Sequence, residues 1–217
     1  MPLARPGRPL LRRTLKAFAA FVAFLIAGNL AIVGAMFWAQ TTSPAGGLEI
    51  PSIRNFRQVD ATLLRGGAPD AANIRALAAE GVTTIVDLRA EENINVDEAL
   101  LDRLGVQRIS IPIRDGQTPT DEDVARFFSI MKSSDGKVYV HCGAGVGRTG
   151  SMVGAYLVSK GIDADEALKR NLSVGPPSLE QIAYVTSLEA GEYQQPNAVI
   201  SAVSRILDGP RRISKYF

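Results

Sequence analysis

The stretch from Lys137 to Gly161 constrains the fold more than any other part of the 217-residue chain. Its first residues, up to His141, have the composition of a short strand, and the apolar run from Thr149 to Lys160 predicts a helix that ends at Gly161. A glycine-rich loop separates the two. Strand, loop and helix in this order direct backbone N–H groups and a helix N-terminus at an anion.

The rest of the chain after about residue 53, here called the body, alternates between strand patterns and helix patterns. Further strands are expected at about 62–65, 82–88 and 106–113. Helices are expected at about 70–80, 97–104, 120–131, 163–171, 178–189 and 197–207. This order predicts an α/β fold with a central, mostly parallel sheet of about four to five strands and helices on both faces.

An apolar run of 23 residues without a charge, 17–39, precedes this body. As a helix it would be about 34 Å long, enough to cross a hydrocarbon core of about 30 Å. We therefore expect one transmembrane helix. The basic cluster in residues 1–16 predicts a cytoplasmic N-terminus and a body across the membrane, in the periplasm if the source is bacterial.

A cleaved signal peptide is the main alternative for this run, with Val33-Gly34-Ala35 as a tolerable cleavage site, although the run is longer than usual for one. A buried core helix fits less well, because the segment has no polar face. We expect a linker at 40–52, one domain at 53–207 and a basic tail at 208–217.

Charge and cysteine usage narrow the classes of function. Without the five basic residues that precede residue 17, the chain has 19 basic and 22 acidic residues, so the body has no basic footprint for nucleic acid. The single cysteine, Cys142, directly follows the single histidine, His141. This excludes a disulfide framework, a cysteine-rich zinc site and a centre of several histidines, and we expect neither metal nor cofactor.

The loop between strand and helix has the chemistry of a phosphate cradle. Glycine tolerates the backbone angles and the close approach that such a loop requires. The residues expected to bind phosphate through their amides are Gly143, Ala144, Gly145, Val146 and Gly147. Arg148 can add a bidentate fork to two phosphate oxygens.

Cys142 is the expected nucleophile. A thiol at a helix N-terminus beside a cation has a lowered pKa, so it should be a thiolate at neutral pH. Thr149 can hydrogen-bond the sulfur and stabilise it as a leaving group. His141 is expected to orient the loop, because neighbours at a strand end point to opposite sides and cannot form a protease-like pair.

The run HCGAGVGRTG resembles the signature loop of the protein tyrosine phosphatase superfamily, His-Cys-x5-Arg-Ser/Thr. Three upstream segments resemble the opening of small dual-specificity phosphatases. They are Asn55-Phe-Arg-Gln-Val, Leu64-Arg-Gly-Gly-Ala-Pro and Gly81-Val-Thr-Thr-Ile-Val-Asp-Leu-Arg. The resemblance covers roughly residues 53 to 190. It implies hydrolysis of phosphate monoesters through a cysteinyl-phosphate intermediate.

A phosphatase of this kind needs a carboxylic acid to protonate the leaving group. Asp115 is our choice, because it follows a strand and resembles the aspartate of the family's mobile acid loop, with Gly116 as a hinge. An ordinary Asp-Gly turn is the alternative. Asp121 and Asp123 are reserve candidates that also suit a helix N-terminus.

Gln181 resembles the glutamine that positions water in some tyrosine phosphatases. It also completes a capping-box pattern with Ser178, so both interpretations stay open.

The substrate is expected to be a phosphorylated protein, in particular phosphotyrosine, because Ala144 and Val146 stand where phosphoinositide-selective relatives often carry lysines. A lipid or inositol phosphate at the membrane is the alternative substrate. Rival functions are a phosphate-binding module without turnover, a metal-dependent phosphatase, and rhodanese or arsenate-reductase chemistry on the same cysteine loop.

Overall fold

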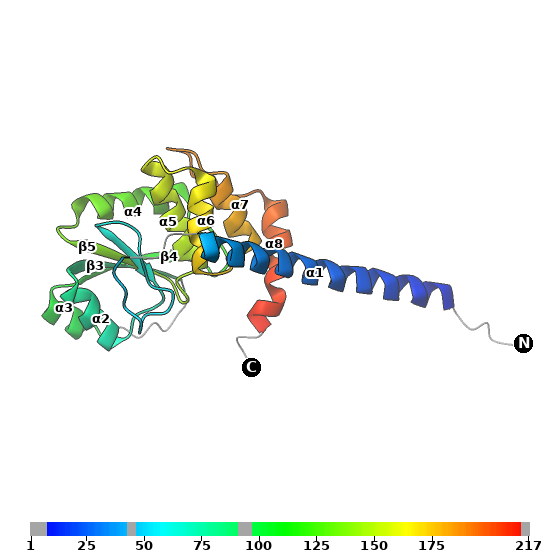
Figure 1. Cartoon of the computed structure of the whole chain (residues 1–217), viewed down its shortest axis with the longest axis horizontal. Helices are drawn as coiled ribbons and strands as arrows, with labels where there is room; N and C mark the ends of the chain where they lie inside the picture. Colours follow the sequence, from blue (N-terminus) through cyan, green and yellow to red (C-terminus); the bar gives the residue numbers. More distant parts are fainter. Residues whose placement is uncertain (1–7, 43–46, 91–96, 214–217) are drawn as a thin grey trace, which may run out of the picture.

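The computed structural model describes residues 8–42, 47–90 and 97–213. Its centre is a five-stranded sheet in the order β1-β2-β5-β3-β4. Figure 1 shows this sheet with helices packed around it. The strands are β1 (Arg57–Gln58), β2 (Leu63–Gly66), β3 (Val82–Arg89), β4 (Gln107–Ile113) and β5 (Lys137–His141). Only β1 is antiparallel to its neighbour, and the other pairs are parallel. The predicted α/β fold with a mostly parallel sheet is confirmed.

Helices cover both faces of this sheet. One face carries α2 (Ala71–Ala79) and α3 (Glu98–Leu104). The other carries α4 (Asp121–Ser133), α5 (Gly147–Ser159), α6 (Ala164–Val174) and α7 (Leu179–Thr186), and α8 (Ala198–Ile213) packs beside α7. Side chains of Asp70, Asp97, Thr120, Asp163 and Ser178 accept backbone N–H bonds at helix starts, as expected of N-caps.

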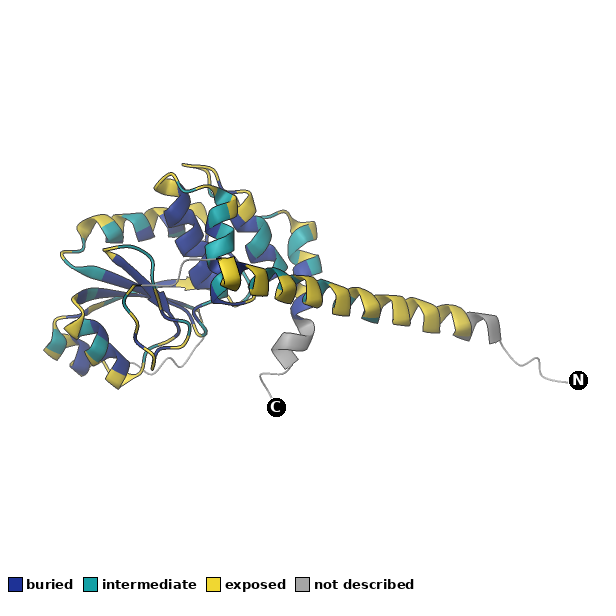
Figure 2. Ribbon diagram, viewed as in Figure 1, coloured by how far each residue is buried: buried dark blue, intermediate teal, exposed yellow. Residues whose placement is uncertain are grey.

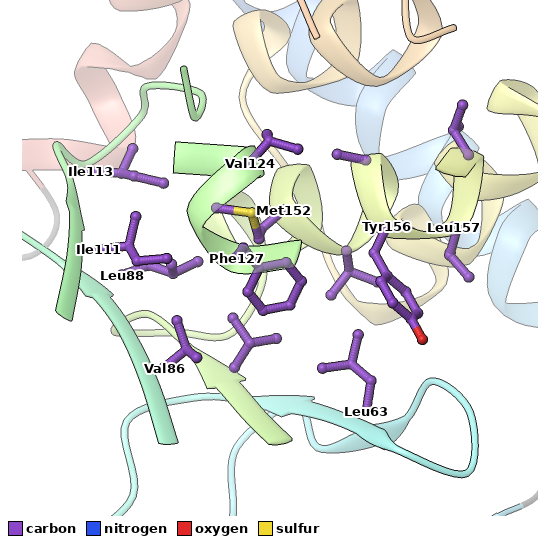
Figure 3. Close-up of a cluster of buried hydrophobic side chains, with 14 of the residues drawn as sticks. Leu63, Val86, Leu88, Ile111, Ile113, Val124, Phe127, Met152, Tyr156 and Leu157 are labelled. Atoms are coloured by element: carbon purple, nitrogen blue, oxygen red, sulfur yellow. The ribbon is translucent and has the colours of Figure 1, made fainter. Parts of the chain in front are cut away.

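Alternation along the central strands divides the core into two clusters. On β5, Val138 and Val140 belong to the larger cluster, under α4 and α5, whereas Tyr139 belongs to the cluster under α2 and α3. Figure 3 shows part of the larger cluster, with Val124 and Phe127 of α4 above Leu63 and Val86 of the sheet. Successive side chains of a strand point to opposite faces. The central strands are therefore apolar on both faces, as in other parallel sheets covered by helices.

Three features of the body differ from the sequence prediction, and the first is that α8 continues to Ile213, beyond the end predicted at residue 207 and into the predicted basic tail. The edge strand β1 was not expected, because two residues give no periodic pattern. Helix α5 begins at Gly147, inside the glycine-rich loop, and not at Thr149. The loop thus runs directly into the first turn of the helix.

The N-terminal helix α1 (Arg8–Thr42) extends away from the domain over much of its length (Figure 1), and its residues 12–42 are long and apolar enough to cross a membrane. Most of its surface is exposed (Figure 2). Its C-terminal part packs against α6 and α8: Ala39 is fully buried, and Lys169 Nζ lies 5.5 Å from the centre of the Trp38 ring. Helix α1 continues two residues beyond the start of the linker predicted at residue 40, and Ile50 is buried.

Candidate active site

The glycine-rich loop lies at the carboxyl ends of the parallel strands. His141, the last residue of β5, pairs with Gly66 of β2 on one side and with Asp87 of β3 on the other. Ligand sites of open α/β sheets occur at this edge. Because α5 begins within the loop, its first N–H groups also face the site.

Four successive carbonyl groups of the loop accept hydrogen bonds from the segment before α2. The pairs are Gly143 O with Ala68 N (3.1 Å), Ala144 O with Asn55 Nδ2 (2.8 Å), Gly145 O with Arg65 Nη2 (2.9 Å) and Val146 O with Arg65 Nη2 (3.4 Å). A planar trans peptide points its C=O and the next N–H in opposite directions. Binding the carbonyls on the outside therefore turns the amides of residues 144–147 inward.

At two positions of the loop, neighbouring atoms lie so close to the backbone that only glycine fits. Gly145 has φ +76°, and a Cβ there would overlap the backbone of Gly66. A Cβ on Gly147 would overlap the side-chain amide of Gln181. The loop is thus packed tightly between β2 and the start of α7, and glycine at these positions allows that approach.

The sulfur of Cys142 is buried and accepts a hydrogen bond from the Gly145 amide at 3.3 Å. Burial raises the pKa of this thiol, but the hydroxyl and amide of Thr149, the charge of Arg148 and the Gly145 amide outweigh it and bring the pKa below its ordinary value. The described residues offer the Thr149 hydroxyl no other hydrogen-bond partner, so the sulfur is the group it faces.

His141 is a neutral, buried part of the scaffold. Burial lowers the pKa of its ring to about 4, although the carboxylate of Asp87 acts in the opposite direction. Its Nδ1 lies 3.1 Å from the carbonyl oxygen of Cys142, which can only accept, so Nδ1 carries the proton. Asp87 is held by Arg89 and Arg108, each at 2.8 Å. This agrees with an orienting role for His141.

Arg148 connects the loop with the segment that follows β4. Its guanidinium is buried, and Nη1 donates to the Ile113 carbonyl at 3.1 Å while Nη2 lies 3.3 Å from a carboxylate oxygen of Asp115. The Asp115 side chain is 47% exposed, in a turn in which Gly116 has φ +82°. The structure therefore brings the predicted acid and the predicted clamp together at one edge of the loop.

Side chains from beyond α6 fasten this acid loop, residues 114–119, through its carbonyls. The pairs are Ser178 Oγ with Gly116 O (3.3 Å), Gln181 Nε2 with Gln117 O (3.2 Å) and Gln195 Nε2 with Thr118 O (3.1 Å). Gln181 also forms the capping box with Ser178. Gln181 thus caps α7 and lies between the two loops, and its role in positioning water stays a prediction.

The reserve acids occupy structural positions. Asp123 forms a capping box with Thr120, and Asp121 lies in the first turn of α4. Carboxylates at these positions stabilise a helix N-terminus. Within the ranges 8–42, 47–90 and 97–213, no group of three or more His, Cys, Asp or Glu residues could hold a metal ion.

Sequence reasoning missed the residues that hold the loop from outside. Asn55 and Arg65 entered only as parts of the family resemblance, and Asn171 and Gln195 not at all. The structure explains the residue type at position 55: Asn55 is the only described non-glycine residue with positive φ (+56°), a conformation that asparagine tolerates better than most residues. Nothing in the local sequence marks Asn171.

These features define the class of cysteine-dependent phosphatases, and comparison with known proteins identifies the family. Residues 52–187 match the family described as DSP-PTPase phosphatase fused to NAD+ Kinase, and the chain belongs to this family.

Among curated proteins, the tyrosine-protein phosphatase cdc-14 of Caenorhabditis elegans is 34% identical over 88 residues. This match covers 40% of the chain and only 12% of that relative.

Two solved structures share the fold. TpbA of P. aeruginosa, in a complex with pTyr, has a TM-score of 0.55 and 24% identity, and the match covers 79% of this chain and 97% of that one. PTPMT1 in complex with PI(5)P has a TM-score of 0.53 and 21% identity, over 60% of this chain and 92% of that one.

Proposed function

We propose that this protein hydrolyses phosphate monoesters through a cysteinyl-phosphate intermediate on Cys142. One observation carries the proposal: a buried cysteine with a lowered pKa lies in a ring of inward amides, with a buried arginine and an aspartate at its edge. A phosphate-binding module without turnover needs neither a thiolate nor an acid. The presence of both beside the same loop favours catalysis.

In the first step the Cys142 thiolate attacks phosphorus, and the ester P–O bond breaks. The loop amides and Arg148 bind the phosphoryl oxygens, on which negative charge increases. Asp115, in its protonated form, donates a proton to the leaving oxygen.

In the second step the Asp115 carboxylate takes a proton from water as that water attacks phosphorus. The S–P bond breaks, inorganic phosphate is released, and the thiolate is restored. Thr149 supports the sulfur as a leaving group by hydrogen bonding, and Gln181, between the acid loop and Gly147, lies where it can orient the water.

For the substrate we propose a phosphorylated protein, with phosphotyrosine preferred. The side chains that the loop presents, Ala144 and Val146, are uncharged and partly exposed, so they offer no site for a second phosphate. The pTyr complex of TpbA, a protein of the same fold, is consistent with this choice.

A lipid phosphate is the second candidate, and the apolar helix α1 is the observation that favours it. The PI(5)P complex of PTPMT1 shows that a protein of this fold accommodates such a ligand. A substrate in the bilayer would place its phosphate near a domain attached to the same membrane.

Phosphate release by the full chain in detergent micelles tests the mechanism and the substrate together. We expect hydrolysis of an aryl phosphate and a phosphotyrosine peptide to be insensitive to chelator, and slower release from phosphatidylinositol phosphate and phosphatidylglycerophosphate. Cys142→Ser should lower the rate by about 10⁴-fold or more. Undiminished turnover by that variant would refute the mechanism, and preference for a lipid would reverse the order of substrates.

We also propose that residues 17–39 anchor the chain, with residues 1–16 in the cytoplasm and the phosphatase domain on the far side of the membrane. Protease accessibility of the domain in sealed vesicles tests the orientation. A mature protein that lacks the residues before Met36 would instead identify a signal peptide.

A further inference from the structure

Arg65 is a buried cation without a carboxylate partner. Its side chain is 2% exposed, and within the described part of the chain no Asp or Glu lies within ion-pairing distance of it. A buried charge is costly unless hydrogen bonds and a nearby opposite charge compensate it. Its position therefore requires an explanation in terms of what surrounds the guanidinium.

Three neutral oxygen atoms hold the guanidinium behind the phosphate loop. Nη1 donates to Oδ1 of Asn171 at 2.6 Å, and Nη2 donates to the carbonyls of Gly145 and Val146. Asn171 in turn donates to the Gly150 carbonyl at 2.7 Å, in the first turns of α5. This chain of contacts ties β2 and α6 to the loop and to the helix that starts there.

Among the described groups, Cys142 in its anionic form is a negative charge that acts on this cation. Burial lowers the pKa of Arg65 to about 10, and the charge of Cys142 opposes that decrease. Arg148 of α5 acts on the sulfur directly and is itself in contact with Asp115, whereas Arg65 lies behind the loop, at the carbonyls of Gly145 and Val146. An uncompensated positive charge beside a loop that binds anions favours the anionic state of that loop.

We propose that Arg65 is a positioning residue that holds the loop amides on the phosphate and supplies a second positive charge to the sulfur and the bound anion. This inference rests on the proposed function only in taking phosphate as the ligand. Arg65 acts from the outer side of the loop, through the carbonyls of Gly145 and Val146. Arg148, in contrast, reaches the edge of the site itself.

Alkylation of the single cysteine by iodoacetamide, followed against pH with and without inorganic phosphate, tests Arg65 in the full-length protein without any turnover. In Arg65→Gln the thiol pKa should rise by about one unit, and protection by phosphate should need about tenfold more phosphate. Arg65→Lys keeps the positive charge but loses the planar guanidinium. In this variant the thiol pKa should stay close to that of the wild type. Arg75→Gln, on the exposed surface of α2, should leave both quantities unchanged.

Two outcomes overturn the inference. An unchanged thiol pKa in Arg65→Gln would leave Arg65 as scaffold only, and equal behaviour of the lysine and glutamine variants would show that the charge has no effect. If Arg65→Gln does not fold, Asn171→Asp decides the question, because its carboxylate would compensate the guanidinium and should raise the thiol pKa in the same way. Because alkylation needs no substrate, failure of this inference and failure of phosphatase activity are distinguishable.

Discussion

The phosphate loop and the acid loop sit side by side, yet the protein holds them differently. The carbonyls of residues 143–146 are bound by the segment before α2, including the fully buried Arg65, and Gly145 leaves no room for a side chain. The carbonyls of the acid loop are also bound by side chains, such as Ser178 and Gln195, but Gln195 lies at the surface and Asp115 is half exposed.

This difference suits the two tasks. A cradle that stabilises a developing charge must not reorganise during the reaction, so its amides are fixed in advance. An acid that serves both a leaving group and an incoming water benefits from a loop that can move. We therefore expect damage to the cradle to affect folding and binding, and damage to the acid loop to affect turnover alone.

The largest effect is expected from Gly145→Ala. The new Cβ would overlap the Gly66 backbone in a conformation that alanine rarely adopts, so the free energy of unfolding should fall by about 4 kcal/mol and phosphate binding should be lost. Urea unfolding and phosphate titration measure the two effects.

Gly105→Ala is the matched control, because Gly105 has a similar φ of +65° and open space around it. It should cost only about 1 kcal/mol, the intrinsic cost of the left-handed conformation. Equal costs at the two positions would mean that the cradle is not tightly packed.

The second expected effect is a pH dependence of stability from His141. Its folded pKa of about 4 lies below its unfolded value near 6.5, so the unfolded state binds more protons between these values and stability falls as the pH decreases through that window. The loss from pH 7 to pH 4 should be about 3 kcal/mol larger in the wild type than in His141→Gln. Parallel curves for the two proteins would contradict a buried neutral imidazole.

Asp115→Asn should lower kcat about 100-fold and leave the free energy of unfolding nearly unchanged, because the side chain is half exposed and acts on the leaving group. The loss should shrink for substrates with better leaving groups. Asp121→Asn is the control, since that residue lies in the first turn of α4, and it should keep wild-type activity. A large loss of kcat in Asp121→Asn together with normal kcat in Asp115→Asn would identify Asp121 as the general acid.

The smallest effect is expected from Gln195→Ala. Removing one partly buried hydrogen bond to the Thr118 carbonyl should lower kcat about threefold, because the acid loop then occupies its catalytic position for a smaller fraction of the time. Its neighbour Gln194 is also exposed and provides the control variant Gln194→Ala. Equal kinetics of the two variants would remove Gln195 from the fastening of the acid loop.

Local signals were sufficient for most of the fold. Strand β5 was predicted with its observed ends, and helices capped by Asp70 or Thr120 began where expected, because these signals lie within a few adjacent residues. The packing of α1 on α6 and α8 was not foreseen. It depends on contacts such as that of Trp38 with Lys169, which are far apart in the chain.

The site was predictable where its residues are contiguous. Cys142, Arg148 and Thr149 lie in one motif, and the structure gathers them around one loop with Asp115. Arg65 and Asn171 are 106 positions apart, and their hydrogen bond exists only once β2 and α6 have packed. A residue whose role is created by tertiary contact leaves no pattern in its own neighbourhood.

The central claim is that phosphate is transferred to Cys142 and then to water. Rapid acid quenching of the full chain during turnover of an aryl phosphate, followed by mass spectrometry of the peptide that contains Cys142, tests it directly. The account predicts one phosphoryl group on that cysteine, more of it in Asp115→Asn with a good leaving group, and none in Cys142→Ser. Steady turnover with an unmodified Cys142 at every quench time would contradict the mechanism.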